Sequence, residues 1–458
     1  MKIRLLVMGC VALALAGPSP RPAAALVVPA TAGSQDTEGG QVATAFAEAP
    51  SGPEASSVPP GAQASPDFDV EEATRAYLAS VPAGDKERSD AYFEGGYWLL
   101  LWNLLVSTTI YLLLLFGGWS ARMRDLGERV TRFRAVHVIA YWFQLTVVTA
   151  FLSFPLTLYQ GFVREHRYGL ATQTFGAWMG DLLKGQVLAL VLGGLFILAL
   201  YTVLRKAPRT WWLWGSAVSL AFLVFGAFIA PVFIAPVFNT YTTLDDPAVA
   251  APILSMARAN GIPASEVYVM DASRQTTRIS ANVSGFLGTE RITLNDNLLN
   301  RTSLPEIEAV MGHEMGHYVL NHTYKMILFF GVVVVLVFSL LYKGSAWALD
   351  RWGEAWGVRA VDDVAGFPLL ALLVALIFFA LTPALNSFIR VQEYEADIFG
   401  LNAARQPDGM AQVSLKLGEY RKLDPGPWEE ILFFDHPSGR TRIQASMRWK
   451  AEHLGELP

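Results

Sequence analysis

The stretch MGHEMGHYVLNHTYKMILFFGVVVVLVFSLLY, residues 311–342, joins a histidine-rich polar segment directly to a long apolar run. From Met326 onward it is apolar enough to lie in lipid, and it approaches the length of about 20 residues that spans a bilayer as a helix. Before that run, two histidines are separated by three residues, and a glutamate follows the first. The stretch therefore predicts a reactive polar helix at the edge of a membrane.

Long apolar runs recur along the chain. Of its 458 residues, 53% are hydrophobic and only 16% are charged, which is unusual for a soluble enzyme. The runs are too long and too many for a soluble core, and tryptophan and tyrosine cluster at their ends, as at a membrane interface. We predict a mostly α-helical, polytopic membrane protein with about six transmembrane helices. The predicted spans are 97–119, 135–159, 187–204, 211–238, 326–342 and 366–388.

Charge and cysteine content restrict the possible partners. A net charge of −5 gives no reason to expect nucleic acid as a partner, whereas the apolar runs require a lipid bilayer. The single cysteine, Cys10, excludes a disulfide framework and a cysteine-rich metal site. Any bound metal must therefore be held by histidine and carboxylate side chains.

The N-terminal part of the chain has the composition of an export signal followed by a linker. Lys2 and Arg4 precede an apolar core, and small residues follow near Ala23, which is the layout of a secretory signal. We predict a signal peptide over residues 1–26. Residues 27–70 are rich in alanine, proline, glycine and serine and too poor in apolar side chains to pack a core, so we predict a disordered linker.

The HEMGH pattern is predicted to lie on a helix. Ser303 is a suitable N-cap, Pro305 fits the first turn, and Glu306 is at the capping-box position. On a helix, residues four apart share one face, so His313 and His317 can both bind one metal ion.

Glu314 is placed to act on water at such a metal. It is rotated by about 100° from His313 along the helix, near the metal but not bound to it, where a general base is needed. The pattern also occurs by chance, but three of the seven histidines fall within 313–322, which chance explains poorly. His322 lies five residues after His317, so we interpret it as a helix-end or interfacial residue rather than a ligand.

The segment RVQEYEADIFG, residues 390–400, offers a third ligand. A zinc site with two histidines and an open water position needs one more protein ligand, commonly a carboxylate. Glu393 and Asp397 share one helix face, whereas Glu395 points away and suits a solvated charged surface. We predict one Zn²⁺ ion bound by the two histidines and Glu393, with Asp397 fixing a ligand imidazole.

These features give a plan for the whole chain. The segments EVYVMD, TRISANVSGF and ERITLND alternate and are rich in β-branched residues, so they predict short strands before the HEMGH helix. We predict an α+β, zincin-like metalloprotease domain that is split by a transmembrane hairpin. The predicted parts are a membrane region of about four spans (92–238), a first protease part (239–325), the hairpin (326–388) and a second protease part (389–458).

Several motifs resemble one known family in the same order. HEMGH on a helix, EYEAD beyond a membrane hairpin and the terminal HPSGRTRI are similar to the integral-membrane zinc endopeptidases of the type I CAAX prenyl protease family. Further similar segments are FPLTLYQGFVREHRYGLATQTFGAWMGDLLKG (154–185), IAPVFNTYTTL (234–244) and GTERITLNDNLL (288–299). The resemblance runs from about Tyr92 to the C-terminus, and it implies helices around a large intramembrane chamber capped by the protease domain.

The resemblance also implies roles for individual residues. It assigns metal binding to His313, His317 and Glu393 and catalytic roles to Glu314, Asp397, His436 and Arg442. The last two would lie near the oxyanion, where positioned donors stabilise a tetrahedral intermediate. On the residues alone, His436 can also be a turn residue before Pro437.

The strand TRISANVSGF resembles the edge along which the family aligns an extended substrate by β-augmentation. The family usually has Asn-Ala-Tyr where this chain has Ser280, Ala281 and Asn282. We expect main-chain pairing to persist at these three residues, while side-chain recognition near the scissile bond differs.

The resulting functional hypothesis is a membrane-embedded, zinc-dependent endopeptidase acting on membrane-associated, lipidated or misfolded proteins in a bacterial inner membrane. The alternative is a non-proteolytic membrane scaffold or chaperone with a structural zinc, which would have no use for Glu314. By the positive-inside rule, two arginine-rich loops are cytoplasmic and the protease segments periplasmic, whereas the family resemblance suggests a cytoplasmic protease domain. The loop cations are Arg122, Arg124, Arg129, Arg132, Arg134, Arg205, Lys206 and Arg209.

Overall fold

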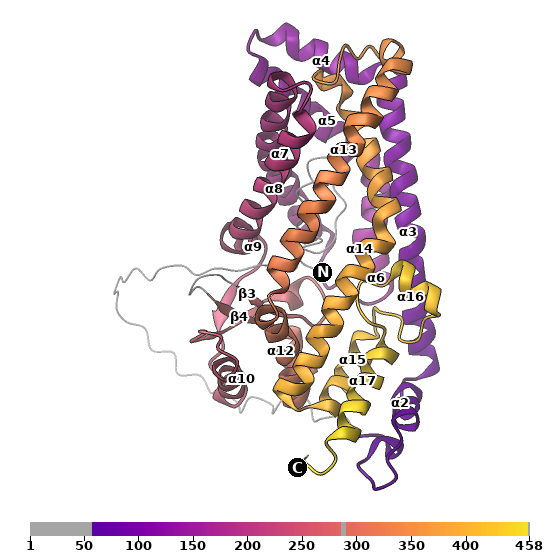
Figure 1. Cartoon of the computed structure of the whole chain (residues 1–458), viewed down its shortest axis with the longest axis vertical. Helices are drawn as coiled ribbons and strands as arrows, with labels where there is room; N and C mark the ends of the chain where they lie inside the picture. The colour runs from indigo at the N-terminus through magenta and orange to yellow at the C-terminus, as the bar shows by residue number, and fades with distance from the viewer. Residues whose placement is uncertain (1–56, 285–289, 457–458) are drawn as a thin grey trace, which may run out of the picture.

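Six long apolar helices run along the long axis of the molecule (Figure 1). The computed structural model describes residues 57–284 and 290–456. The helices are α3 (Ala83–Phe116), α5 (Arg134–Leu158), α7 (Phe175–Lys206), α8 (Trp211–Ile229), α13 (His322–Trp356) and α14 (Phe367–Ala404). Each is long and apolar enough to cross a membrane, so the predicted mostly helical membrane protein with about six spans is confirmed for the residues that the structure describes.

Short elements extend or connect these spans. The π-helix η2 (Tyr159–Val163) and α6 (Arg164–Arg167) continue α5, and the π-helix η3 (Ala230–Ile234) and α9 (Ala235–Phe238) continue α8. At the end of the bundle where α3 ends and α5 begins, called the far end below, α4 (Trp119–Val130) packs against α5 and the loop that contains η5 (Val364–Gly366). There the buried Arg124 pairs with Asp363, and this ion pair ties the first two spans to the last.

A small α+β unit lies at the opposite end of the spans from α4 (Figure 1). Its sheet has the order β1-β2-β4-β3, with β2 and β4 parallel and the outer pairs antiparallel. The strands are β1 (Tyr241–Thr243), β2 (Val267–Met270), β3 (Ala281–Ser284) and β4 (Arg291–Asn295). The helices are α10 (Pro247–Ala259), η4 (Ala272–Arg274), α11 (Asp296–Arg301), α12 (Leu304–Val319), α15 (Pro407–Leu417), α16 (Pro427–Phe433) and α17 (Gly439–Glu452).

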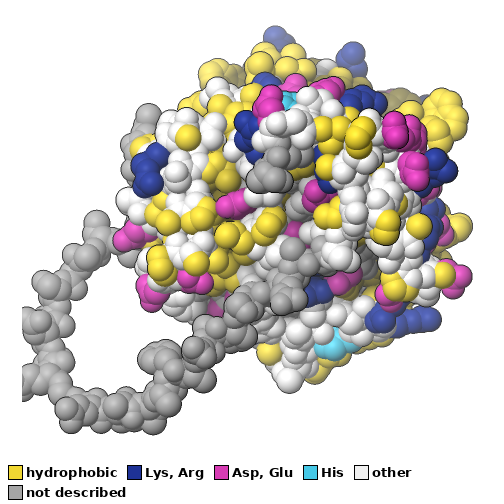
Figure 2. Space-filling view, turned by 90° about the horizontal axis from the view of Figure 1, so that it is seen from below, with side chains coloured by type: hydrophobic (Ala, Val, Ile, Leu, Met, Phe, Trp, Pro, Cys, Tyr) yellow, Lys and Arg dark blue, Asp and Glu magenta, His cyan; other side chains and the backbone are white. Residues whose placement is uncertain are grey.

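This unit has its own apolar core, in which α10, β2, β4 and α12 pack together. Seen from this end, acidic and basic side chains are spread over the surface among hydrophobic ones (Figure 2). Each of the three predicted strand segments contains a strand, whereas β1 was not predicted because its three residues are too few for a visible alternation.

The chain is packed from residue 57, earlier than the predicted linker allows. The 3₁₀ helix η1 (Pro60–Ala62) and α2 (Val70–Ala79) lie against α17, with Ala62 fully buried. The ammonium group of Lys450 donates to the carbonyl oxygen of Ala62 at 2.8 Å, so specific contacts hold a segment whose composition predicts disorder. The signal peptide predicted over residues 1–26 lies outside the described residues.

The last span does not stop where its apolar run stops. α14 continues unbroken from Phe367 to Ala404, across the predicted boundary between the hairpin and the second protease part at residues 388 and 389. Its C-terminal turns carry Glu393 and Asp397. A membrane helix therefore delivers these carboxylates directly to the α+β unit.

α12 and α14 cross at close range over small residues. Gly312 and Gly316 on α12 face Ala396 and Gly400 on α14. A Cβ at Gly400 would lie 2.7 Å from the backbone nitrogen of His313, and a Cβ at Gly316 would lie 3.1 Å from the Cα of Ala396. Small residues allow helix backbones to approach in this way. Because both helices carry predicted metal ligands on these turns, the crossing sets how closely the ligands approach.

Gly400→Ala is expected to push α12 away from α14 and to weaken metal binding. Overpacking of this kind costs about 1–3 kcal/mol, so we expect metal affinity to fall about tenfold in competition with a chromogenic chelator. Gly176→Ala is the control, because a Cβ at that position meets no atom within 4 Å. Equal metal affinity in both variants and the wild type would contradict the close crossing.

Candidate metal centre

The start of α12 is fixed by a capping box. The backbone N–H and the hydroxyl of Ser303 both donate to the carboxylate of Glu306 at 2.7 Å. Lys416 from α15 lies 2.8 Å from the same carboxylate, which is completely buried. The capping box predicted from the sequence therefore forms. The ion pair between Lys416 and Glu306 also joins the helix that carries the HEMGH motif to α15 in the second protease part.

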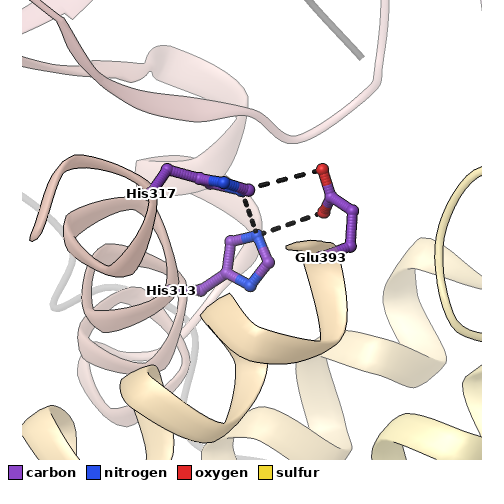
Figure 3. A group of neighbouring side chains, drawn as sticks. All are labelled: His313, His317 and Glu393. Atoms are coloured by element: carbon purple, nitrogen blue, oxygen red, sulfur yellow. Dashed lines mark hydrogen bonds and ion pairs between the residues drawn. The ribbon is translucent and has the colours of Figure 1, made fainter. Parts of the chain in front are cut away.

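Two imidazoles and one carboxylate converge where α12 crosses α14 (Figure 3). Nε2 of His313 lies 3.1 Å from Nε2 of His317 and 3.4 Å from Oε2 of Glu393. Nε2 of His317 lies 3.7 Å from Oε1 of Glu393. The three candidate ligand atoms all lie within 4.8 Å of one another, so the residues predicted as ligands form one group.

The chemistry of this group fits a divalent cation. The two Nε2 atoms lie 3.1 Å apart, so both can turn a lone pair to one cation once the proton between them is displaced, and the carboxylate adds negative charge. Two imidazoles and one carboxylate without sulfur suit zinc. Three protein ligands would also leave one position for water or substrate.

Burial and hydrogen bonding act differently on the two histidines. Burial lowers the pKa of His317 well below its usual range. Burial also opposes protonation of His313, but the hydrogen bonds and charges of Asp397 and Glu393 outweigh it and raise the pKa of His313 to about 9. In metal-free protein at neutral pH, His313 therefore carries two ring protons and His317 carries one.

Asp397 lies behind His313. Its Oδ1 accepts a hydrogen bond from Nδ1 of His313 at 2.8 Å, which turns Nε2 of that ring toward the centre of the group. Arg442 from α17 lies with its Nε 3.0 Å from Oδ2 of Asp397 and its Nη2 3.5 Å from Oε2 of Glu393. The buried guanidinium therefore offsets the charge of two buried carboxylates, and its role near the oxyanion stays a prediction.

His436 lies in the loop between α16 and α17. Its Nε2 is 3.2 Å from Oε2 of Glu393, and its Nδ1 is 2.8 Å from Oδ1 of Asp435. The ring is buried. The structure therefore brings His436 to the predicted ligand carboxylate, although the residue also lies in a bend directly before Pro437.

Glu314 differs from the other acids near the group. It is half-buried on α12 and has no hydrogen-bond or ion-pair partner within residues 57–284 and 290–456, whereas Glu393 and Asp397 both have cationic partners. A carboxylate in this state is available to accept a proton.

Sequence reasoning missed a further part of the site. The buried His322 contacts His317, and Glu395 contacts His322. From the sequence, His322 was interpreted as a helix-end or interfacial residue and Glu395 as a solvated charge. His322 is at a helix end, as interpreted, because it begins α13, but its contact with His317 was not foreseen because one continuous helix was assumed. α12 ends at Val319, and the chain turns at Asn321 with φ 57°, which brings His322 back to the motif.

The predicted substrate-binding residues lie on or next to β3. Ala281 and Asn282 belong to this strand, which is last in the sheet order and packs against α12. Ser280 precedes it, and its backbone N–H donates to the side chain of Asn295 at 3.1 Å. The strand singled out from the sequence therefore packs against the helix that carries the HEMGH motif, and its role in substrate binding stays a prediction.

Comparisons with known proteins cover most of the chain. Residues 243–450 match peptidase family M48, and residues 74–240 match the N-terminal domain of CAAX prenyl proteases, described as five membrane helices. A CAAX prenyl protease 1 homolog of Dictyostelium discoideum is 30% identical over 293 residues, which are 62% of this chain and 67% of that protein.

Two further relatives extend the likeness. An uncharacterized metalloprotease, YhfN, of Bacillus subtilis is 29% identical over 337 residues, which are 73% of this chain and 79% of that protein. The crystal structure of S. mikatae Ste24p has a similar fold, with a TM-score of 0.67 and 23% identity, and the likeness covers 80% of this chain and 89% of that one.

The pKa of His313 gives a prediction for metal binding. At a pH below the His313 pKa of about 9, the incoming metal must displace one proton from Nε2 of His313. The neutral His317 releases no proton. Apparent zinc affinity should therefore rise about tenfold per pH unit between about pH 6 and 8. Calorimetric titrations in buffers of different ionisation enthalpy would measure the proton release, and an affinity independent of pH would contradict the assignment.

Proposed function

The chain belongs to peptidase family M48, and from this premise we propose that it is a zinc-dependent endopeptidase of the membrane. Its substrates would be membrane-associated proteins, lipidated or misfolded ones among them. The observation that carries the proposal is the convergence of His313, His317 and Glu393. Glu314, the proposed base, directly follows His313 on the same helix.

The proposed mechanism is metal-assisted hydrolysis. His313, His317 and Glu393 would hold a zinc ion, which would supply Lewis acidity to activate water and to polarise the scissile carbonyl. Glu314 accepts the proton of the attacking water and returns a proton to the leaving amine. A structural zinc in a scaffold would have no use for such a base, so Glu314 argues against that alternative.

Other residues hold and orient the reacting groups. Asp397 keeps Nε2 of His313 directed at the metal. Arg442 holds both carboxylates in place, and we assign it a supporting position near the developing negative oxygen. His436 would donate to that oxygen when substrate is present.

We propose that an extended substrate lies along β3. The support for this is the position of the strand at the end of the sheet order and against α12, whose HEMGH motif supplies the ligands and the base. Main-chain pairing along β3 would align many sequences, as expected for a protease that acts on diverse membrane-associated proteins. Ser280 would contribute by position only, because both of its backbone groups already bond Asn295.

We further propose that the protein lies in a bacterial inner membrane with the active site on the periplasmic side. The multi-pass chain begins, from residue 57, at the end of the bundle that carries α12 and α17, so a signal over residues 1–26 would export this end. The far end carries the arginine-rich α4 and the loop that contains Arg209, as expected for the cytoplasmic face.

Glu314→Gln is expected to abolish peptide hydrolysis while zinc is retained. Loss of the general base should lower the rate by at least about 100-fold, because the amide cannot accept the proton. Purified protein in detergent would be assayed on an unfolded membrane-protein substrate, with bound zinc quantified in parallel. Glu308→Gln, on the same helix but another face, is the control, and equal cleavage by both variants would sink the base assignment.

The orientation can be tested with introduced cysteines, because the chain has only Cys10. In a Cys10→Ser background, Gly455→Cys marks the protease end and Thr210→Cys marks the far end, and both positions are exposed. A membrane-impermeant maleimide should label the first variant in intact spheroplasts and the second only after lysis. The reverse pattern would place the active site in the cytoplasm.

A further inference from the structure

A row of hydrogen bonds extends from His317 away from the metal group. Nδ1 of His317 lies 2.9 Å from Nδ1 of His322, and Nε2 of His322 lies 3.1 Å from Oε2 of Glu395. The ammonium group of Lys325 donates to the same oxygen at 2.8 Å. His322 is only 3% exposed, whereas Glu395 and Lys325 reach the surface. One buried imidazole thus links a candidate metal ligand to an exposed ion pair.

A single arrangement of protons satisfies both imidazole contacts. If Nε2 of His317 binds the metal, the ring proton is on Nδ1, and that N–H must donate. Nδ1 of His322 then accepts, so the proton of His322 is on Nε2, where it donates to the carboxylate of Glu395. Through His322, Glu395 therefore selects the tautomer of His317 in which Nδ1 carries the proton and Nε2 is free to bind the metal.

The two metal-binding rings are supported in different ways. Asp397 accepts directly from Nδ1 of His313. At His317 the corresponding position is taken by His322, and the carboxylate lies one ring farther away. Three helices contribute to this second support. His317 lies in the last turn of α12, His322 and Lys325 lie in the first turn of the span α13, and Glu395 extends from the span α14.

We propose that His322 is a positioning residue that fixes the tautomer and the ring orientation of His317, and that Glu395 completes this support from the surface. The inference rests on the proposed metal-dependent function. It assigns the residues that follow the HEMGH motif a part in the metal centre, in addition to their part in starting a membrane helix. Partners that orient ligand imidazoles typically change metal affinity by about 10–100-fold when they are removed.

Metal binding by purified full-length protein tests the proposal without an activity assay. His322→Phe keeps a ring but removes the acceptor, so we expect zinc affinity to fall about 10–100-fold and the visible absorption of the Co²⁺-loaded protein to change. His322→Asn should restore most of the affinity, because its side-chain oxygen can accept near the position of Nδ1. Glu395→Ala should show a smaller loss.

His453→Phe is the matched control, because His453 stacks on Trp449 and contacts no residue of the metal group. If the wild type itself binds neither Zn²⁺ nor Co²⁺, the proposed function fails. If the wild type binds both ions while His322→Phe and Glu395→Ala keep wild-type affinity and spectrum, the function stands and the inference is overturned. If His322→Phe does not fold, unchanged affinity and spectrum in Glu395→Ala overturn it.

Discussion

Backbone packing between α12 and α14 is the constraint on which the rest of the structure depends. Gly312, Gly316, Ala396 and Gly400 keep the crossing free of large side chains, so the turns that carry histidines and the turns that carry carboxylates come within ligand distance. A larger residue at the crossing would separate the ligands even if all of them were kept. The chemistry therefore depends on residues that have no reactive groups.

The same crossing joins the membrane part to the reactive part. α14 is a spanning helix whose last turns supply Glu393, and α13 begins with the residue that contacts His317. The α+β unit is thus built on the ends of two membrane helices rather than attached by a linker. The proposed active site is accordingly held at the ends of two spans, which suits the proposed membrane-associated substrates.

Much of this could be predicted from sequence because the signals are local. Apolar length gave the spans, and the spacing of His313, His317, Glu393 and Asp397 on their helices gave the ligand group. The features that were not predicted are the extent of α14 and the position of His322, and neither is set by the local residue pattern. The apolar run before Glu393 stops although its helix continues, and the place of His322 depends on a left-handed turn that no periodicity reveals. The small residues at the crossing are visible in the sequence, but which helices they join is not.

The most direct test of the central claim is X-ray absorption at the zinc edge on purified full-length protein, combined with the zinc content per chain. The account predicts one zinc per chain, with two imidazole nitrogens at about 2.0–2.1 Å and oxygen ligands at about 2.0–2.2 Å, one of them exchangeable water. Protein without zinc, or zinc in a closed shell of four protein ligands, would contradict it.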